Sequence, residues 1–302
     1  MRLSKTITRL AAAGVLLTLP LAVPRPACAG RLGADMIALF PKDIGEFAYA
    51  DLKKARTLKW FPQLQEQMLP DRFRQFEKFL ASAGIALGNY NPGSTEAYFK
   101  RQKLPTFKSR GYTLYAFGTG SGPNDLFFFF LDSSTAAFGH RALLEKMIEV
   151  RFGGEEGLLR NDKFYPLINE VNGAGVVWAV LNPAYTRLAM QQLAPEVEQF
   201  PEAAKIVRRM ENLLITVDTS GSIDGKFQAV CGSTEDANIL SQLLQAGLLY
   251  KRYQASQDNP ELAQLLDRAQ IAPAGDRAVL RMSLSDEQMT SLIKRNTFAL
   301  KL

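Results

Sequence analysis

The sequence predicts an α+β protein of two tandem β-α-β-β-α-β-like (ferredoxin-like) units, each an antiparallel sheet with helices packed on one face. Two stretches a hundred residues apart carry this prediction, FFFFLDSSTAAFGHRALL (127–144) and FQAVCGSTEDANILSQLL (227–244). Each has the pattern of a strand, a Ser/Thr-rich cap and an amphipathic helix, and each follows another strand across a Gly-rich turn. A second echo, NDKFYPLINEVN before VVWAVL and NPELAQLLDRAQ before AVLRMSL, supports an internal duplication.

The N-terminal 29 residues have the order of a secretory signal peptide: a cationic patch, an apolar run over 10–23, and Ala-Cys-Ala before Gly30. The run is shorter than the roughly 20 residues of a spanning helix. We therefore expect cleavage after Ala29 and a periplasmic or secreted protein with no transmembrane segment after cleavage. Lipidation at Cys28 or retention of the signal as an anchor are the alternatives. The predicted modules are 30–174 and 175–302.

Cleavage changes the charge. The full chain has a formal charge of +6, but the predicted signal peptide holds four basic residues and no acidic one. The mature chain would carry 32 basic and 30 acidic residues, so the basic footprint of a nucleic-acid binder is lost. Cys28 leaves as well, and Cys231 alone forms no disulfide within the chain.

The elements expected for the first module begin with a strand at 44–52. A helical region interrupted by Pro62 and Pro70 follows, with Phe73, Phe76, Phe79 and Leu80 at helical spacing. Residues 88–110, rich in Gly, Pro and basic residues, are expected to be mostly irregular. A hairpin (YTLYAFG, TGSGPN, DLFFFFL), a helix over about 134–152 and a short helix over about 162–171 complete the module.

The second module is expected to repeat this pattern. A strand at 176–181 can close the first unit, open the second, or do both. Asn182-Pro183 is typical of a helix start, and this helix is interrupted near Pro201. The strands LLITVD and KFQAVC flank the turn TSGSIDG, and a long helix begins at Thr234. The helix NPELAQLLDRA, the strand AVLRMSL and the helix SDEQMTSLIKR close the chain.

The apparent motifs give no catalytic, cofactor-binding or metal-ligating residue. GTGSG (118–122) and TSGSIDGK (219–226) resemble phosphate loops, but both join two strands, whereas a phosphate loop opens a helix. We interpret both as hairpin turns. His140, the only histidine, aligns with Leu240 and is interpreted as a half-buried helix residue. Cys231 is expected to be an inert core thiol.

Strand alternation predicts a difference between the two sheets. In the second module Thr216, Asp218 and Gln228 are expected to face solvent, as on an antiparallel sheet with one wet face. The corresponding face of the first sheet is aromatic: Tyr115, Phe117, Phe128 and Phe130. Four such side chains, half covered, would expose roughly 300–400 Å². Either the chain itself covers them, through the second module or the 88–110 connection, or they bind a partner or an apolar ligand.

Three segments, GEFAYADLKKAR, AFGHRALLEKMIEVRFGGEEGLLRNDKFYPLINEV and VVWAVL, resemble secreted bacterial proteins with a duplicated α+β body. The resemblance covers most of the mature chain and implies fold and export only. It brings no activity and no catalytic residues.

These observations favour an exported, non-enzymatic binding or protein-interaction module, in one form an accessory subunit of a cell-envelope assembly. Its contact surface would be the aromatic face. Two alternatives stay open: a carboxylate-dependent hydrolase acting on envelope sugars, which needs two convergent acids, one with a raised pKa, and a carrier of an apolar small molecule in a cavity between the modules. The sequence gives no oligomeric state.

Overall fold

The computed structural model describes residues 31–68, 83–122, 125–193 and 201–294. The predicted signal peptide and the predicted helical segment around Phe73 to Leu80 lie outside these residues. In the part of the chain that is described, no helix combines the length and the apolar character needed to cross a membrane.

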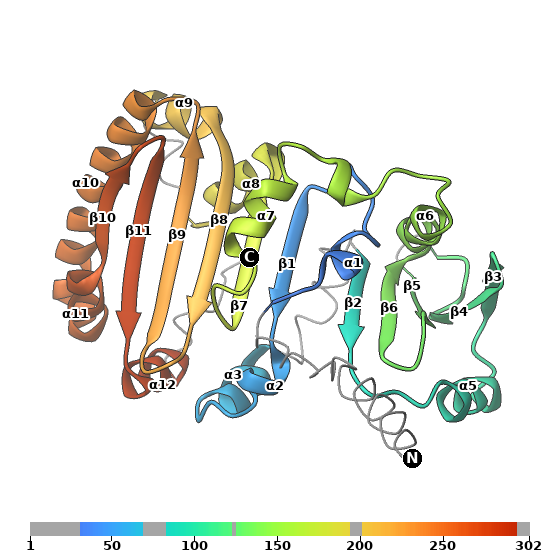
Figure 1. Ribbon diagram of the computed structural model, residues 1–302. Coiled ribbons are helices and arrows are strands. Elements are labelled where there is room, and N and C mark those ends of the chain that lie inside the picture. The colour runs from blue at the N-terminus through green and yellow to red at the C-terminus, as the bar shows by residue number, and fades with distance from the viewer. Residues whose placement is uncertain (1–30, 69–82, 123–124, 194–200, 295–302) are drawn as a thin grey trace, which may run out of the picture.

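Two antiparallel sheets lie side by side, with helices around them, as Figure 1 shows. The strands of the six-stranded sheet follow the order β1 (Glu46–Ala50), β7 (Val177–Leu181), β8 (Met210–Asp218), β9 (Ile223–Cys231), β11 (Arg277–Leu284), β10 (Gln270–Ala274). Those of the five-stranded sheet follow the order β2 (Ala83–Leu87), β6 (Thr135–His140), β5 (Leu126–Phe130), β4 (Tyr112–Phe117), β3 (Thr106–Ser109). The predicted α+β class with two antiparallel sheets is confirmed.

Strand β7 joins the N-terminal part of the chain to the second module. It pairs with β1 on one side and with β8 on the other, antiparallel in both cases. The strand predicted near residue 46 is therefore an edge of the six-stranded sheet, so the sheets do not divide at residue 175. Because β7 and β8 are direct antiparallel neighbours, the second module also differs from the split β-α-β motif of ferredoxin-like folds. In that motif the two strands that flank the helix are parallel, and another strand separates them.

Helices cover both faces of the six-stranded sheet. Helices α8 (Pro183–Leu193), α9 (Pro201–Arg209) and α10 (Thr234–Asp258) pack on the face that carries Ala229 and Cys231. On the other face, Ile37 of α1 (Ala34–Ile37), Leu158 of the 3-10 helix η1 (Leu158–Arg160) and Ile168 of α7 (Tyr165–Val171) pack with Trp178.

The solvent-facing role predicted for Thr216 and Gln228 is therefore wrong. These side chains keep 9% and 6% of their surface exposed. The pattern of polar residues on β8 and β9 is real, but α7 and the N-terminal residues bury that face against Trp178, Val180 and Leu214. Asp218 lies at the turn end of β8 and is partly exposed. Alternation indicates which residues share a face, but it does not indicate whether a distant helix covers it.

A third layer closes one end of the six-stranded sheet. Trp60, beside α3 (Phe61–Met68), packs with Leu265 of α11 (Pro260–Arg268) and Leu292 of α12 (Asp286–Lys294). Its indole Nε1 donates a hydrogen bond of 3.1 Å to Asp286. Helices α8 to α12 confirm the helices predicted at 183–210, from Thr234, over NPELAQLLDRA and over SDEQMTSLIKR.

The five-stranded body departs most from the expectations. Residues 83–87 form β2, and the connection expected to be irregular contains helix α5 (Pro92–Arg101) and strand β3. The helix expected from about 134 is strand β6 followed by α6 (Arg141–Arg151). Asp132 explains the difference, because its carboxylate accepts hydrogen bonds from the backbone N–H and the hydroxyl of Ser134 and thereby closes a tight turn.

The second copy lacks that turn. There Ser233 accepts a hydrogen bond from the backbone N–H of Asp236, and two acidic residues occupy the first turn of α10. This is the pattern of a helix start. Two similar Ser/Thr-rich stretches therefore begin different elements, a hairpin turn in one copy and a helix in the other.

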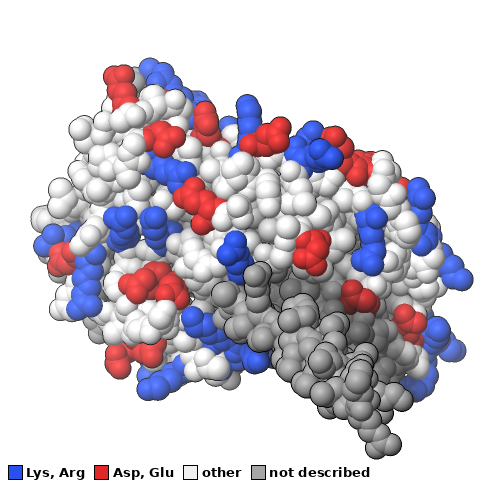
Figure 2. Space-filling view, viewed as in Figure 1, with Lys and Arg blue, Asp and Glu red and all other residues white. Residues whose placement is uncertain are grey.

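The two bodies share residues at their junction. Phe40 contacts the buried clusters of both sheets, and Pro41 forms a bridge with Gly157. Helix α2 (Leu52–Ala55) follows the other end of β1 and lies beside α3, at the bottom of the view in Figure 1. On the face seen in Figure 2, positive and negative side chains of the described residues alternate rather than gather into one basic patch.

Candidate functional site: the aromatic face of the five-stranded sheet

The four aromatic residues expected to share one face of the first sheet do so. Tyr115 on β4 lies directly opposite Phe128 on β5 in the strand register. The Phe128 ring lies 5.0 Å from Phe130 and 6.4 Å from Phe117, measured between centroids. Leu114 and Phe127, which alternate with these aromatic residues along β4 and β5, lie on the opposite face and form the core under α6. Alternation therefore assigned both faces correctly.

Helix α5 covers most of this aromatic face. Its Phe99 is 8% exposed and has ring centroids 5.1 Å from Tyr115, 5.5 Å from Phe117 and 6.0 Å from Phe128. The Tyr90 ring, in the segment before α5, lies 5.5 Å from Phe130. The cover is thus the 88–110 connection, one of the alternatives that the sequence leaves open.

The local sequence explains why this cover is a helix. Asn91 caps α5, because its side-chain oxygen accepts a hydrogen bond of 3.0 Å from the backbone N–H of Ser94. Pro92 occupies the first turn, where its missing N–H costs nothing, and the basic residues Lys100 and Arg101 occupy the last turn. Composition made this stretch look irregular, but the Asn-Pro start and the basic end are helix signals.

Exposure divides the four predicted site residues. Tyr115 is 1% exposed and belongs to the interior, and Phe128 and Phe130 are half-buried. Phe117 is 49% exposed, and Tyr98 on α5 is 51% exposed. Both rings contact Phe99, Tyr98 at 6.1 Å and Phe117 at 5.5 Å. We call Tyr98 and Phe117 the aromatic rim. Whether a partner binds there stays a prediction.

The electrostatics around Tyr115 follow from its cover. Burial raises the pKa of the Tyr115 hydroxyl, and the negative charge of Glu96 on α5 raises it further. Burial also raises the pKa of Tyr90. Both phenols therefore stay protonated at neutral pH, and neither has the lowered pKa of an activated nucleophile. The face can bind by shape and apolar contact.

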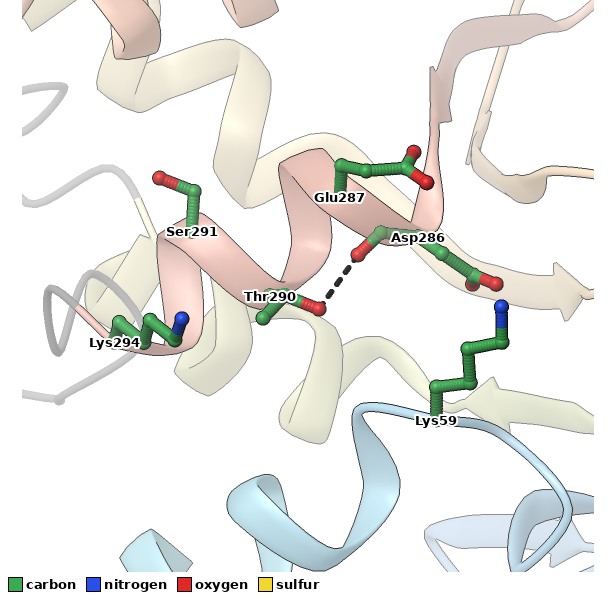
Figure 3. A pocket seen from close by; sticks show the side chains of 6 residues that line it. All are labelled: Lys59, Asp286, Glu287, Thr290, Ser291 and Lys294. Carbon is green, nitrogen blue, oxygen red and sulfur yellow. Dashed lines mark hydrogen bonds between the residues drawn. The ribbon is translucent and has the colours of Figure 1, made fainter.

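A separate hollow of about 410 Å³ lies beside α12 and is lined by Lys59, Asp286, Glu287, Thr290, Ser291 and Lys294 (Figure 3). In that view Lys59 points toward Asp286, and the Thr290 hydroxyl donates to the Asp286 carbonyl oxygen over 2.7 Å. Hydrogen bonds from its own backbone N–H and from Ser285 lower the pKa of Glu287, so this acid is ionised at neutral pH.

The two alternative functions need other arrangements. A glycosidase acid requires a raised carboxyl pKa. Desolvation raises the pKa of Glu46, but this residue lies on β1 and does not line the hollow. None of the four predicted aromatic residues lines it either. Among the described residues, no three His, Cys, Asp or Glu side chains gather as metal ligands would.

The remaining motifs take structural roles. GTGSG lies in the β4–β5 connection, with positive φ at Gly118 and Gly120. In the stretch TSGSIDG only residues 219–222 form the β8–β9 turn, and Ile223 to Gly225 begin strand β9. Cys231 is 3% exposed, so its predicted core position is confirmed. Desolvation raises the pKa of its thiol to about 11, and the low reactivity of this thiol stays a prediction. The alignment of His140 with Leu240 is wrong, because His140 ends β6 whereas Leu240 lies within α10.

Sequence reasoning missed the residues that complete the site. Phe99 and Tyr90 lie in the stretch expected to be irregular. Phe138 pairs with Phe128 in the register of β6 and β5, and its ring fills the space beside Gly84. An Asn-Pro pair followed by aromatic residues at 98 and 99 was the available signal for α5.

Comparison with known proteins gives likeness of architecture only. No family model matches the chain, and no curated protein matches it. Among solved structures, crystal form III of TP0453 resembles it with 12% identity and a TM-score of 0.48, over 86% of this chain and 97% of that chain. Crystal form I of TP0453 gives 12% identity and a TM-score of 0.47, over 86% and 96%. A likeness of this size assigns neither activity nor site residues.

Proposed function

We propose that the chain is an exported, non-enzymatic protein-interaction module, and that the aromatic rim of Tyr98 and Phe117 is its contact surface on the five-stranded body. The observation that carries the proposal is a pair of half-exposed rings held on a buried aromatic cluster. Such rings lose little conformational entropy on binding and are enriched at the centres of protein interfaces.

The rim refines the aromatic face expected from the sequence. Tyr115 and Phe128 act as its support, because Phe99 packs on both rings. A partner would therefore touch Phe117 and Tyr98 and would leave the supporting rings in place. The proposed setting is a cell-envelope assembly in which this chain is an accessory subunit.

Site-specific photo-crosslinking in the native cell tests the proposal. A photoreactive phenylalanine analogue is placed at position 117 and, as a control, at position 152, because Phe152 is 53% exposed in the same body but lies at the end of α6. We expect an adduct with one envelope protein from position 117 and none from position 152. The variant Phe117→Ser should abolish co-purification of that protein, whereas Phe152→Ser should not.

Two results would contradict the proposal. One is the absence of any adduct at position 117 in cells that produce the folded chain. The other is the same set of adducts at both positions, which would indicate random collision rather than a contact surface.

A further inference from the structure

Helix α10 carries two apolar faces. One packs on the six-stranded sheet and includes Ala237 at 0% and Leu240 at 2% exposure. The opposite face is also apolar but exposed: Ile239 37%, Leu243 37%, Leu249 62%, Tyr250 59%, Tyr253 68%. A helix with apolar residues all round is normally buried on all sides. The second face of α10 therefore needs a cover that the described chain does not supply.

The spacing of the exposed residues indicates what kind of cover fits. Ile239, Leu243, Ala246, Tyr250 and Tyr253 follow one another at intervals of four, three, four and three residues. This 3.5-residue period is the seam by which one helix packs against another. We call these five residues the α10 seam.

The charge pattern favours a protein helix over a lipid surface. No charged residue occurs from Ala237 to Tyr250, and the margins of the seam are neutral amides such as Gln242 and Gln254. Helices that lie on membranes usually carry Lys and Arg along such margins. The first cations after this uncharged stretch are Lys251 and Arg252, and Arg252 forms an ion pair with Asp267 on α11. Depletion of charge is typical of the core of a protein interface.

We propose that the α10 seam pairs, antiparallel, with the α10 seam of a second copy of this chain. The seam is complementary to itself when a two-fold axis passes between residues 244 and 245. Leu243 then lies opposite Ala246 of the second copy, a large residue against a small one, and Ile239 lies opposite Tyr250. The helix dipoles are antiparallel in this arrangement.

The margin residues fit the same register. The Tyr250 hydroxyl accepts a hydrogen bond of 2.8 Å from Gln254 Nε2 on its own helix. Its O–H remains a donor and can reach an amide oxygen at the margin of the second copy. Tyr253 lies over the first turn of the second helix, where Glu235 supplies an acceptor.

The exposed area suits a weak, reversible dimer. With about 150–250 Å² for an aromatic side chain, the exposed fractions of the seam and Leu249 sum to roughly 400–500 Å² per copy. This equals the largest apolar patch of an ordinary monomer. Two copies would bury about 1,000 Å², the lower limit of a specific interface, so we expect a weak dimer that dissociates on dilution.

The proposal is independent of the aromatic rim. Helix α10 lies at the outer side of the six-stranded sheet and α5 at the far end of the five-stranded body (Figure 1). A dimer through α10 therefore leaves Tyr98 and Phe117 free in both copies.

Sedimentation velocity of the purified chain from about 1 to 200 μM tests the dimer. We expect a shift from monomer to dimer across this range. Leu243→Glu, and separately Tyr250→Gln, should raise the dissociation constant at least tenfold while the thermal melting temperature stays within a few degrees. Leu188→Glu is the control, because Leu188 is 42% exposed on α8, outside the seam.

Disulfide trapping tests the register. In a Cys231→Ala background, a Leu243→Cys chain mixed with an Ala246→Cys chain should form a mixed disulfide faster than either forms a disulfide with itself. Monomer at all concentrations, or a dimer that Leu243→Glu leaves intact, would overturn the proposal. So would flotation of the chain with phosphatidylglycerol-containing vesicles that Leu243→Glu abolishes, because the seam would then contact lipid.

Discussion

Replacing Phe99 by alanine tests whether α5 is a structural cover of the aromatic face. Phe99 is 8% exposed, so its burial contributes about 1.5–3 kcal/mol, and its ring pairs with Tyr115, Phe117 and Phe128 add about 0.5 kcal/mol or more each. Large-to-small core substitutions of phenylalanine cost about 3–5 kcal/mol. Since α5 lies at the surface and can move inward, we expect a loss of about 3 kcal/mol for Phe99→Ala.

The matched control is Tyr98→Ala on the same helix. Tyr98 is 51% exposed and its ring contacts Phe99, so its loss should cost about 1 kcal/mol or less. Both variants remove one aromatic ring from α5 and differ in burial. Equal losses of stability for the two variants would refute the assignment of Phe99 as the core of the cover.

The assay must observe the five-stranded body. Both tryptophans of the chain, Trp60 and Trp178, belong to clusters of the six-stranded body. Tryptophan fluorescence would therefore miss a local loss. Urea unfolding followed by far-ultraviolet circular dichroism, with hydrogen exchange of the α5 and β4 amides, reports the relevant part.

Three further predictions follow from single contacts. Arg277 on β11 donates two hydrogen bonds to Glu170 on α7 and lowers the pKa of that carboxyl. The stability from this pair is therefore present above the unfolded pKa of about 4.3 and is lost as pH falls through the lower folded pKa. In urea titrations Glu170→Gln should cost about 0.5–1 kcal/mol at pH 7, since the carboxylate is partly exposed, and this cost should shrink as the carboxyl is protonated in acid. Cys231, with a pKa of about 11, should be about 0.1% thiolate at pH 8 and react with iodoacetamide only after urea unfolding, and rapid labelling of the folded chain would contradict its burial. Gly175→Ala should lower the melting temperature by several degrees in calorimetry, because the new Cβ would overlap the backbone carbonyl oxygen of Val217 on β8. Gly221→Ala should change the melting temperature little, because no other atom lies near the new Cβ in that open turn.

The sequence was sufficient where local chemistry decides the structure. The cap at Ser233, the Asn182-Pro183 start of α8 and the glycine turns at 118–122 were each readable, because a helix start or a tight turn needs particular side chains nearby. Strand alternation likewise placed Tyr115 and Phe128 on a common face. These features depend on neighbours within a few residues.

The rest depended on distant partners. Thr216 and Gln228 are buried because α7 and residues near Ile37 cover them, and no local pattern on β8 or β9 indicates that cover. Strand β10 contains Pro273, which is typical of an edge strand and hides the strand signal. For the candidate site, the aromatic residues of the sheet were predictable, whereas Phe99, which decides how much of the face is open, was not.

The position of β1 has a consequence for how this chain can be divided and made. Its hydrogen-bonding partner β7 is synthesised more than 120 residues later, with the whole five-stranded body in between. During synthesis β1 would thus stay unpaired until β7 has been made. Pairing these two strands closes a long loop, which should slow folding. A cut at residue 175 would separate β1 from its neighbour and leave β7 with a bare edge, so recombinant halves of this protein should aggregate unless β1 is supplied to the second half as a peptide or by circular permutation.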